Sequence, residues 1–143
     1  MERLYGSKED LVSSYEAFKV SIIIDTHTLY WFLTADKRLS RIAKNTIEET
    51  ETIVIPTIVL LELLYIFQKK KQAELFPVAF KSFKNDKKFI FASLDLATVE
   101  EVLRVSPILE IHDRTIVATA QMLRSPIVTK DRTIRKVYKE TIW

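Results

Sequence analysis

Two kinds of hydrophobic pattern alternate along this chain. Continuous apolar runs, which are typical of strands buried on both faces of a parallel sheet, occupy residues 20–24, 52–55, 88–92 and 127–129. The segments between them carry apolar residues at the three- and four-residue spacing of amphipathic helices. Strands that alternate with helices predict an α/β fold, a three-layer α/β/α sandwich around a central, mainly parallel sheet.

Capping and helix-breaking residues give approximate helix limits. Ser40 and Asp95 are suited to cap the helices that follow them, and Ile42, Ala43 and Ile47 have helical spacing after Ser40. The proline at position 56 suits the first turn of a helix, and the one at 77 is a possible break. Besides the helix after Ser40, helices are predicted at 7–18, 28–34, 57–70, 73–85, 96–105, 113–123 and 131–138, with an edge strand at 141–143.

The segment 57–67 is apolar on nearly all sides, and Glu62 is its one charged residue. A helix of this kind is buried on more than one side, either within its own fold or against a partner subunit. We therefore expect a homodimer.

Length and composition limit the class of protein. A chain of 143 residues, 48% hydrophobic and 29% charged, is predicted to form one globular domain, residues 20–143, preceded by an extension at 1–19 that we expect to be helical. The absence of cysteine excludes disulfides and thiolate zinc sites and favours a cytoplasmic protein. The longest apolar stretch, 53–67, is too short to cross a membrane, and a single glycine excludes a P-loop or dinucleotide-binding motif.

Positive charge is concentrated in one segment, although the net charge is only +3. Residues 69–88 hold seven lysines and two acids. This lysine-rich segment has two interpretations: it follows the phosphates of a nucleic acid, or it is a solvated helical surface.

Three aspartates follow predicted strands or begin a predicted helix. Asp25 and Asp131 each come just after a strand, so both are expected at the carboxyl edge of the sheet, where open α/β folds bind ligands. Asp113 is expected at a helix start, where free backbone N–H groups favour an anion. Each also has a purely structural explanation as a turn former or helix cap.

Glu62 is harder to explain structurally, because ionised carboxylates are rarely buried without a partner. One alternative is a salt bridge, for which Arg114 is a candidate. The other is a cluster with the aspartates, which would suit Mg²⁺ or Mn²⁺, since both prefer oxygen ligands. Such ions support phosphodiester cleavage. His27 and His112 are expected to be packed or hydrogen-bonding neighbours rather than ligands.

Four segments that contain these acids, in order, resemble the acidic motifs of PIN domains, most of all the VapC-type toxins of toxin–antitoxin pairs. They are IIIDTHTL (22–29), LLEL (60–63), HDRTIVATA (112–120) and IVTKDR (127–132). The resemblance implies a Mg²⁺- or Mn²⁺-dependent ribonuclease with a five-stranded parallel sheet, usually dimeric and held inactive by an antitoxin.

The same resemblance assigns roles to individual residues. Asp25, Glu62 and Asp113 correspond to the three main acids, and Asp131 to the more variable fourth acid. Thr129 would lend a hydroxyl nearby, and Thr26 and Arg114 are the other candidate auxiliary residues. The chain departs from the pattern at Glu110, where many relatives carry an aspartate, and in the length of the segment that precedes the first strand.

Three alternatives share parts of this pattern. A haloacid dehalogenase-type phosphatase needs a second acid two residues after the first, where this chain has His27. A phosphoacceptor receiver domain uses one strand-end aspartate and leaves Glu62 unexplained. A non-catalytic RNA-binding or regulatory PIN-like domain keeps the fold without the metal, and the complete set of acids argues against it.

Overall fold

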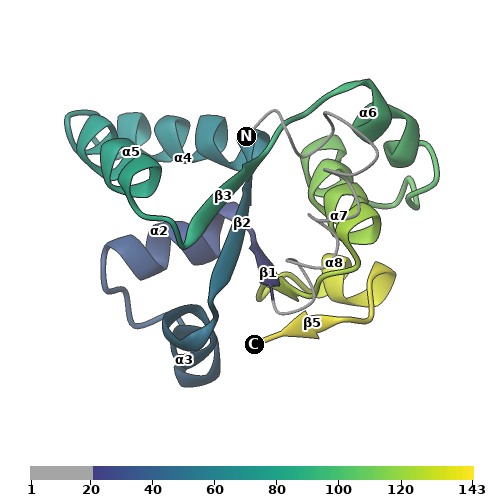
Figure 1. Ribbon diagram of the computed structural model, residues 1–143, viewed down its shortest axis with the longest axis horizontal. Helices are drawn as coiled ribbons and strands as arrows, with labels where there is room; N and C mark the ends of the chain where they lie inside the picture. The colour runs from purple at the N-terminus through teal and green to yellow at the C-terminus, as the bar shows by residue number, and fades with distance from the viewer. Residues whose placement is uncertain (1–20) are drawn as a thin grey trace.

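The computed structural model describes residues 21–143, which form one five-stranded parallel sheet with helices on both sides (Figure 1). The predicted three-layer α/β/α fold is therefore confirmed. The helix predicted at 7–18 lies outside the described residues. No helix of the described part is long and apolar enough to cross a membrane.

The order of the strands creates a crevice beside β1. The strands are β1 (Ser21–Ile24), β2 (Thr52–Pro56), β3 (Phe89–Ala92), β4 (Ile127–Val128) and β5 (Thr141–Ile142), arranged as β3-β2-β1-β4-β5. The chain first builds the sheet from β1 towards β3 and then returns to the other side of β1, where Ile24 pairs with Val128. Parallel sheets bind ligands at such a switch point, beyond the carboxyl ends of the strands.

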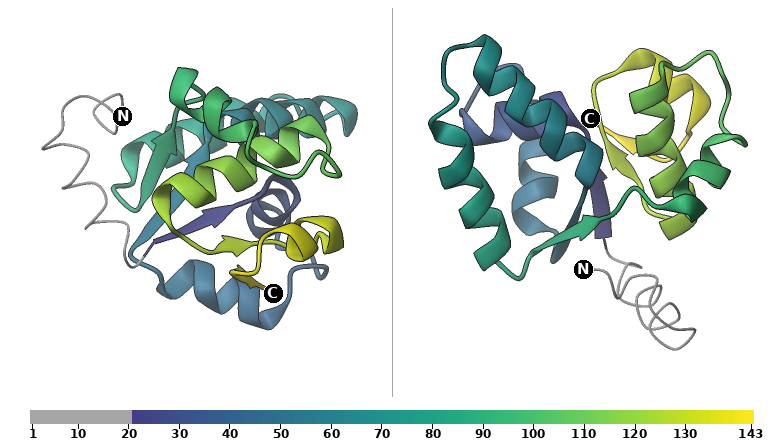
Figure 2. Two further views of the ribbon diagram at one scale, coloured as in Figure 1. Left: turned by 90° about the vertical axis from the view of Figure 1, so that its right-hand side faces the viewer. Right: turned by 90° about the horizontal axis from the view of Figure 1, so that it is seen from above.

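The helices divide into two layers according to the direction of each crossover. Those between β1 and β3 cover one face of the sheet, and those after β3 cover the other, as Figures 1 and 2 show. Because crossovers are right-handed, reversing the direction of strand addition moves the connecting helices to the opposite face. The first layer holds α2 (Thr26–Leu33), α3 (Arg41–Glu49), α4 (Thr57–Lys69) and α5 (Leu75–Asn85), and the second holds α6 (Leu96–Val102), α7 (Ile111–Leu123) and α8 (Arg132–Val137).

The two central strands are buried as the sequence pattern predicts. Ile23, Ile24, Ile53 and Ile55 are fully buried, because a strand between two helical layers has no solvent-facing side. Each such side chain contributes about 2–3 kcal/mol through removal of apolar surface from water. The rigid core thereby fixes the position of the residue that follows β1.

Several predicted limits differ from the structure. Helix α2 begins at Thr26 rather than at residue 28, because Asp25 caps it. Pro56 ends β2 instead of entering the following helix. Pro77 lies in the first turn of α5, where its missing N–H would have no helical partner, so the helix is unbroken. Helix α6 ends at Val102 rather than at residue 105.

The predicted cap at Ser40 is confirmed, since its hydroxyl accepts a hydrogen bond from the backbone N–H of Ala43 at 3.0 Å. Ala43 and Ile47 are buried as an i, i+4 pair. Ile42 is 60% exposed, so only part of the predicted apolar spacing faces the core.

Candidate active site

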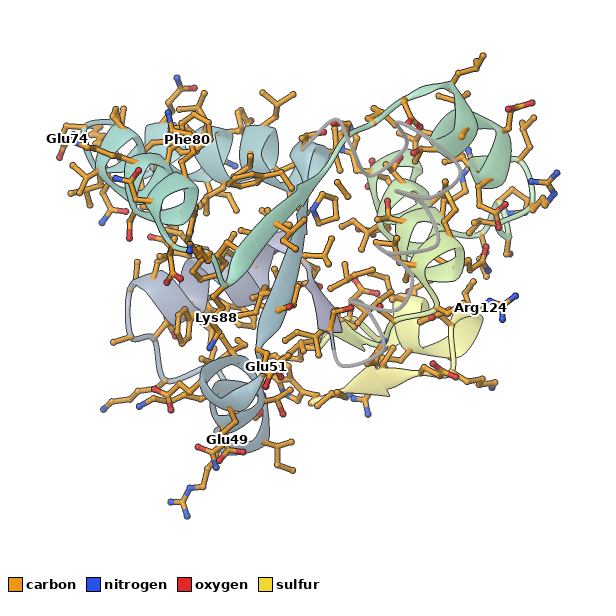
Figure 3. All side chains as sticks on the ribbon, viewed as in Figure 1. Glu49, Glu51, Glu74, Phe80, Lys88 and Arg124 are labelled. Atoms are coloured by element: carbon orange, nitrogen blue, oxygen red, sulfur yellow. The ribbon has the colours of Figure 1, made fainter. Side chains whose placement is uncertain are left out.

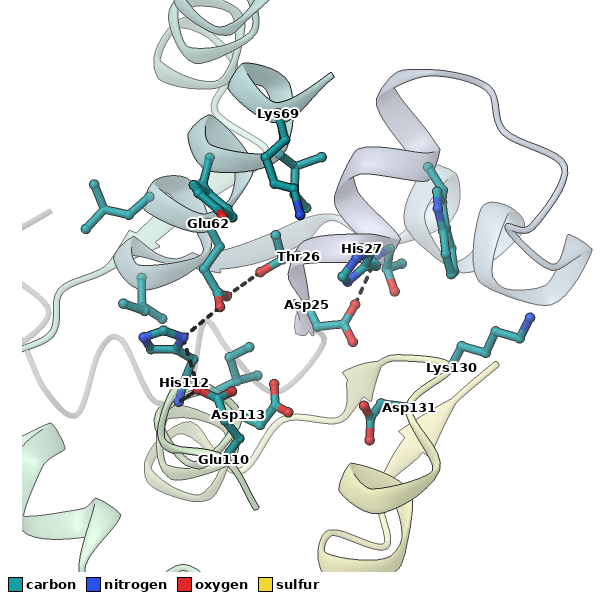
Figure 4. Close-up of a pocket in the computed structure, with 17 residues that line it drawn as sticks. Asp25, Thr26, His27, Glu62, Lys69, Glu110, His112, Asp113, Lys130 and Asp131 are labelled. Carbon is teal, nitrogen blue, oxygen red and sulfur yellow. Dashed lines mark hydrogen bonds and ion pairs between the residues drawn. The ribbon is translucent and has the colours of Figure 1, made fainter. Parts of the chain in front are cut away.

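A cavity of about 960 Å³ opens at the carboxyl edge of the sheet, beside the switch point between β1 and β4. All four predicted acids line it: Asp25, Glu62, Asp113 and Asp131. Figure 4 shows the carboxylates of the three aspartates directed into one common space. The fold thus brings together residues from four segments that are far apart in the sequence.

Asp25 is the most firmly held of these acids. It is 8% exposed, its Oδ1 accepts from the backbone N–H of Thr28 at 3.1 Å, and its Oδ2 accepts from the hydroxyl of Thr129. Burial raises the pKa of the Asp25 carboxyl, and the hydrogen bonds from Thr129 and Thr28 act in the opposite direction. Two donors therefore fix the orientation of a carboxylate at the end of β1.

Thr129 connects Asp25 to the segment that carries the fourth acid. Its side chain is fully buried, and its hydroxyl oxygen also accepts from the backbone N–H of Asp131 at 3.0 Å. Asp131 in turn caps α8, because its Oδ1 accepts from the backbone N–H of Ile134 at 2.9 Å. The structural explanation considered for Asp131, a helix cap, is thus correct, and the residue lines the cavity as well.

Glu62 lies on α4 among polar partners. Its Oε1 accepts from the hydroxyl of Thr26 at 2.6 Å, and its Oε2 lies 3.1 Å from Nδ1 of His112. Its side chain is 28% exposed, so the carboxylate is not enclosed in apolar surroundings as the helix pattern suggested. The salt bridge to Arg114 that we considered is absent.

The start of α7 contributes a further acid and a histidine. Glu110 caps the helix, its Oε1 accepting from the backbone N–H of His112 at 3.3 Å, so Asp113 lies in the first turn rather than at the cap. His112 Nδ1 lies 3.2 Å from Oε1 of Glu110 as well as close to Glu62, and it is the hydrogen-bonding neighbour that the sequence suggested.

The electrostatics of Asp113 reflect the crowding of like charges. Its pKa is raised from an ordinary value of 3.8 to about 6. Burial is the largest cause, followed by the negative charges of Asp131, Glu110, Glu62 and Asp25. At neutral pH the cavity therefore holds an unfavourable concentration of negative charge.

Two predicted auxiliary residues do not reach the cavity. Thr129 is not among the residues that line it but donates its hydroxyl to Asp25, and Arg114 neither lines the cavity nor forms an ion pair with any residue of 21–143. The Arg114 Nε atom is buried without a hydrogen-bond partner. Thr26, the third auxiliary candidate, lines the cavity and holds Glu62.

Two lysines form a basic part of the cavity, of which the sequence suggested Lys69, within the lysine-rich segment, but not Lys130. Lys69 projects from α4 and Lys130 from the loop after β4 (Figure 4). Lys130 stands directly before Asp131, so a position next to a candidate acid was the available signal. Of the lysine-rich segment, Lys69 alone lines this cavity.

The donor set suits a hard cation, although the carboxylates are not gathered around one point. Within 21–143, no three acidic or histidine side chains are arranged closely enough to hold an ion between them. All four acids nevertheless offer oxygen atoms to one cavity, where burial, and after it the mutual repulsion of the acids, raises the pKa of Asp113. Divalent cations such as Mg²⁺ prefer such ligands and would remove the repulsion.

Residues 22–140 match the model of the PIN domain family, described as "PIN domain". No curated protein matches the chain. Several solved structures share the fold. A toxin–antitoxin complex from Klebsiella pneumoniae is 22% identical, with a TM-score of 0.65 over 85% of this chain and 96% of that one.

Two further structures are similar at lower identity. VapBC2 from Rickettsia felis, bound to a DNA fragment from its promoter, is 17% identical, with a TM-score of 0.66 over 86% of this chain and 99% of that one. VapC20 from Mycobacterium tuberculosis, a toxin that cleaves the sarcin–ricin loop, is 15% identical, with a TM-score of 0.65 over 80% and 93%. At these identities the likeness establishes a common fold.

Proposed function

Because the chain belongs to the PIN domain family, we propose that it is a metal-dependent endoribonuclease and the toxin of a toxin–antitoxin pair. The observation that carries this proposal is the convergence of Asp25, Glu62, Asp113 and Asp131 on one cavity. The reaction is hydrolysis of an RNA phosphodiester bond. The similar structures, which include a toxin–antitoxin complex and an RNA-cleaving toxin, support the same function.

The four acids would hold Mg²⁺ or Mn²⁺. Such an ion, when bound, supplies Lewis-acid stabilisation of the charge that develops on the phosphate oxygens. Asp25 contributes a carboxylate whose orientation two hydrogen bonds have already fixed. Glu62 is held in the same way by Thr26 and His112. These two acids therefore need little rearrangement, which lowers the entropy lost when the site is assembled.

Asp113 and Asp131 have different parts in this proposal. Asp131 is fixed by its cap to α8 and lies at the exposed side of the cavity. Asp113 is the carboxyl whose pKa is raised to about 6, so it exchanges a proton near neutral pH until a cation lowers that pKa. Loss of either acid is expected to weaken metal binding without removing the two anchored acids.

We also propose a homodimer and a protein antitoxin as partners. On α4, Leu61 is 64% exposed and Tyr65 is 60% exposed, so the uncovered side of the helix carries two large apolar side chains at the rim of the cavity. Exposed apolar surface of this kind favours association with another chain. Two of the similar structures are complexes of a toxin with its antitoxin, which supports an antitoxin as partner. An RNA substrate is consistent with a cytoplasmic protein.

A cleavage assay on labelled single-stranded RNA tests the proposal. Cleavage should require Mg²⁺ or Mn²⁺, stop on addition of EDTA and be lost in Asp25→Asn. Asp86→Asn is the matched control, since Asp86 is an exposed aspartate outside the cavity. Cleavage that survives both chelation and Asp25→Asn would contradict the proposal. Binding of RNA without cleavage under every metal condition would instead indicate a non-catalytic RNA-binding PIN domain.

A further inference from the structure

A second cavity, of about 360 Å³, adjoins the acid-lined one and has the opposite charge. The two cavities share a wall made of His27, Trp31, Ile66 and Lys69. The remaining lining residues of the second cavity are Tyr30, Arg38 and Lys70, and none of its lining residues is an acid. Its volume lies within the range of ligand-binding pockets.

The positive charge of the two lysines of this cavity is only partly balanced by a nearby acid: the pKa of Asp36 is lowered first by its hydrogen bonds with Arg38 and to a smaller extent by the charge of Lys70. Within 21–143, neither Lys69 nor Lys70 forms an ion pair. Their ammonium groups lie over ring faces instead: Lys69 is 5.5 Å from the ring centroid of Tyr65, and Lys70 is 5.8 Å from that of Tyr30. Ring contacts orient an ammonium group but leave its charge available to an anion.

Arg38 contributes less, because Asp36 already binds its guanidinium group at 2.7 Å. Its role here is geometric: it lies 5.2 Å from the ring centroid of Trp31. Trp31 also packs edge-on against Trp143 and beside His27. Trp31 is thus the packed part of the shared wall, and the net positive charge of the second cavity comes from the lysines.

The change of sign across this wall suggests which ligand the second cavity takes. A nucleic-acid strand carries one negative charge per nucleotide. A divalent cation held by the four acids would offset the charge of the phosphate that is cut, but not the charges of the phosphates on either side of it. The neighbouring phosphates of the strand must avoid the four carboxylates. Lys69, on the wall between the two cavities, and Lys70 offer positive charge in the second cavity, as Lys130 does within the first. We propose that the second cavity binds a phosphate group of the RNA strand next to the bond that is cut. This inference rests on the proposed function and names a substrate-binding subsite within it.

The subsite separates the lysine-rich segment into lysines that bind the strand and lysines that do not. Lys71, the neighbour of Lys70, is exposed and lines neither cavity. Lys84 lies over the ring of Phe80, and Lys88 donates to the backbone carbonyl of Glu48 beside α3 (Figure 3). Position in the fold, rather than charge in the sequence, would therefore decide which lysines matter.

Fluorescence anisotropy with a labelled single-stranded RNA of about ten nucleotides tests this assignment, since single-strand sites span about 4–16 nucleotides. Asp25→Asn, which prevents cleavage, serves as the parent, and Lys70→Gln is compared with Lys71→Gln within it. Both changes remove one exposed charge, one residue apart. Circular dichroism confirms that both variants remain folded.

Lys70→Gln should raise Kd about fivefold at 0.1 M salt and reduce the slope of log K against log salt by about 0.7, the contribution of one single-strand phosphate contact. Lys71→Gln should leave both nearly unchanged. If the two variants weaken binding equally, or neither does, the subsite is wrong while the proposed nuclease stands. If the parent binds no RNA and the unmodified protein cuts none, the proposed function fails and the subsite fails with it.

Discussion

Replacing Asp113 with asparagine should stabilise the metal-free protein at neutral pH. The pKa of this carboxyl is raised from 3.8 to about 6 by burial and by the four surrounding acids. A carboxyl with a raised pKa binds its proton more tightly in the folded than in the unfolded protein. The folded state is therefore penalised above about pH 6, and the penalty disappears as the pH falls below about 4, near the unfolded pKa.

The size of the effect follows from the structure. A rise from 3.8 to about 6 corresponds to about 3 kcal/mol for a fully desolvated group. Asp113 is only half-buried, so solvent screening reduces this to about 1.5 kcal/mol. Its place in the first turn of α7 restores about 0.5 kcal/mol through the helix dipole, which asparagine would lose. The expected net gain is about 1 kcal/mol, or about 3 °C in Tm for a domain of this size.

Thermal or urea unfolding of the two metal-free proteins between about pH 4 and pH 8 measures this gain. The difference should be largest at the alkaline end and should vanish near pH 4. With Mn²⁺ the order should reverse, because the unmodified protein binds the ion more tightly and binding stabilises the native state. An asparagine variant that is less stable at pH 8, or a difference that does not change with pH, would refute the raised pKa of Asp113.

Three further changes test other parts of the site. Thr129→Val leaves Asp25 without its hydroxyl donor. It should lower the stability measured by urea unfolding by about 2 kcal/mol and reduce cleavage in a nuclease assay. Thr129→Ser, which keeps the hydroxyl, should retain both. Glu62→Gln should abolish cleavage. It should change the free energy of unfolding of the apo protein by less than about 0.5 kcal/mol, since its pair with His112 is partly exposed. A destabilised but active variant would show that the residue is structural. Leu61→Lys should convert a dimer to a monomer in sedimentation at tens of micromolar, and a monomeric unmodified protein would remove that prediction.

The four acids show how far a sequence pattern leads to a site. Asp25 and Asp131 were placed correctly because the end of a buried strand in a parallel sheet has one possible location, the carboxyl edge. Glu62 was found because a charge stands out in an apolar helix. These signals are local, and they depend only on the period of the hydrophobic pattern and on where it is interrupted.

The hydrogen-bond partners of those acids come from distant parts of the sequence. The hydroxyl of Thr129 reaches Asp25 across 104 positions of sequence, and Thr26 reaches Glu62 across 36. The resemblance to PIN domains named both threonines as residues near the site, but no local pattern shows which acid each hydroxyl reaches. The pairing of β1 with β4 creates the first contact, and the packing of α2 against α4 creates the second.

The sequence by itself determined the alternation of strands and helices and the parallel sheet, and it indicated the four candidate acids, because each depends on local periodicity and on residue type. Only the tertiary structure decided the partners of Glu62, the cap of α7 at Glu110 and the separation of Lys70 from Lys71. The physical reason is that side-chain contacts and cavity walls depend on how distant elements pack. Lys70 is the C-cap of α4 and lines the second cavity, whereas Lys71, the next residue, has a positive φ and lines neither cavity, and no local pattern records that difference.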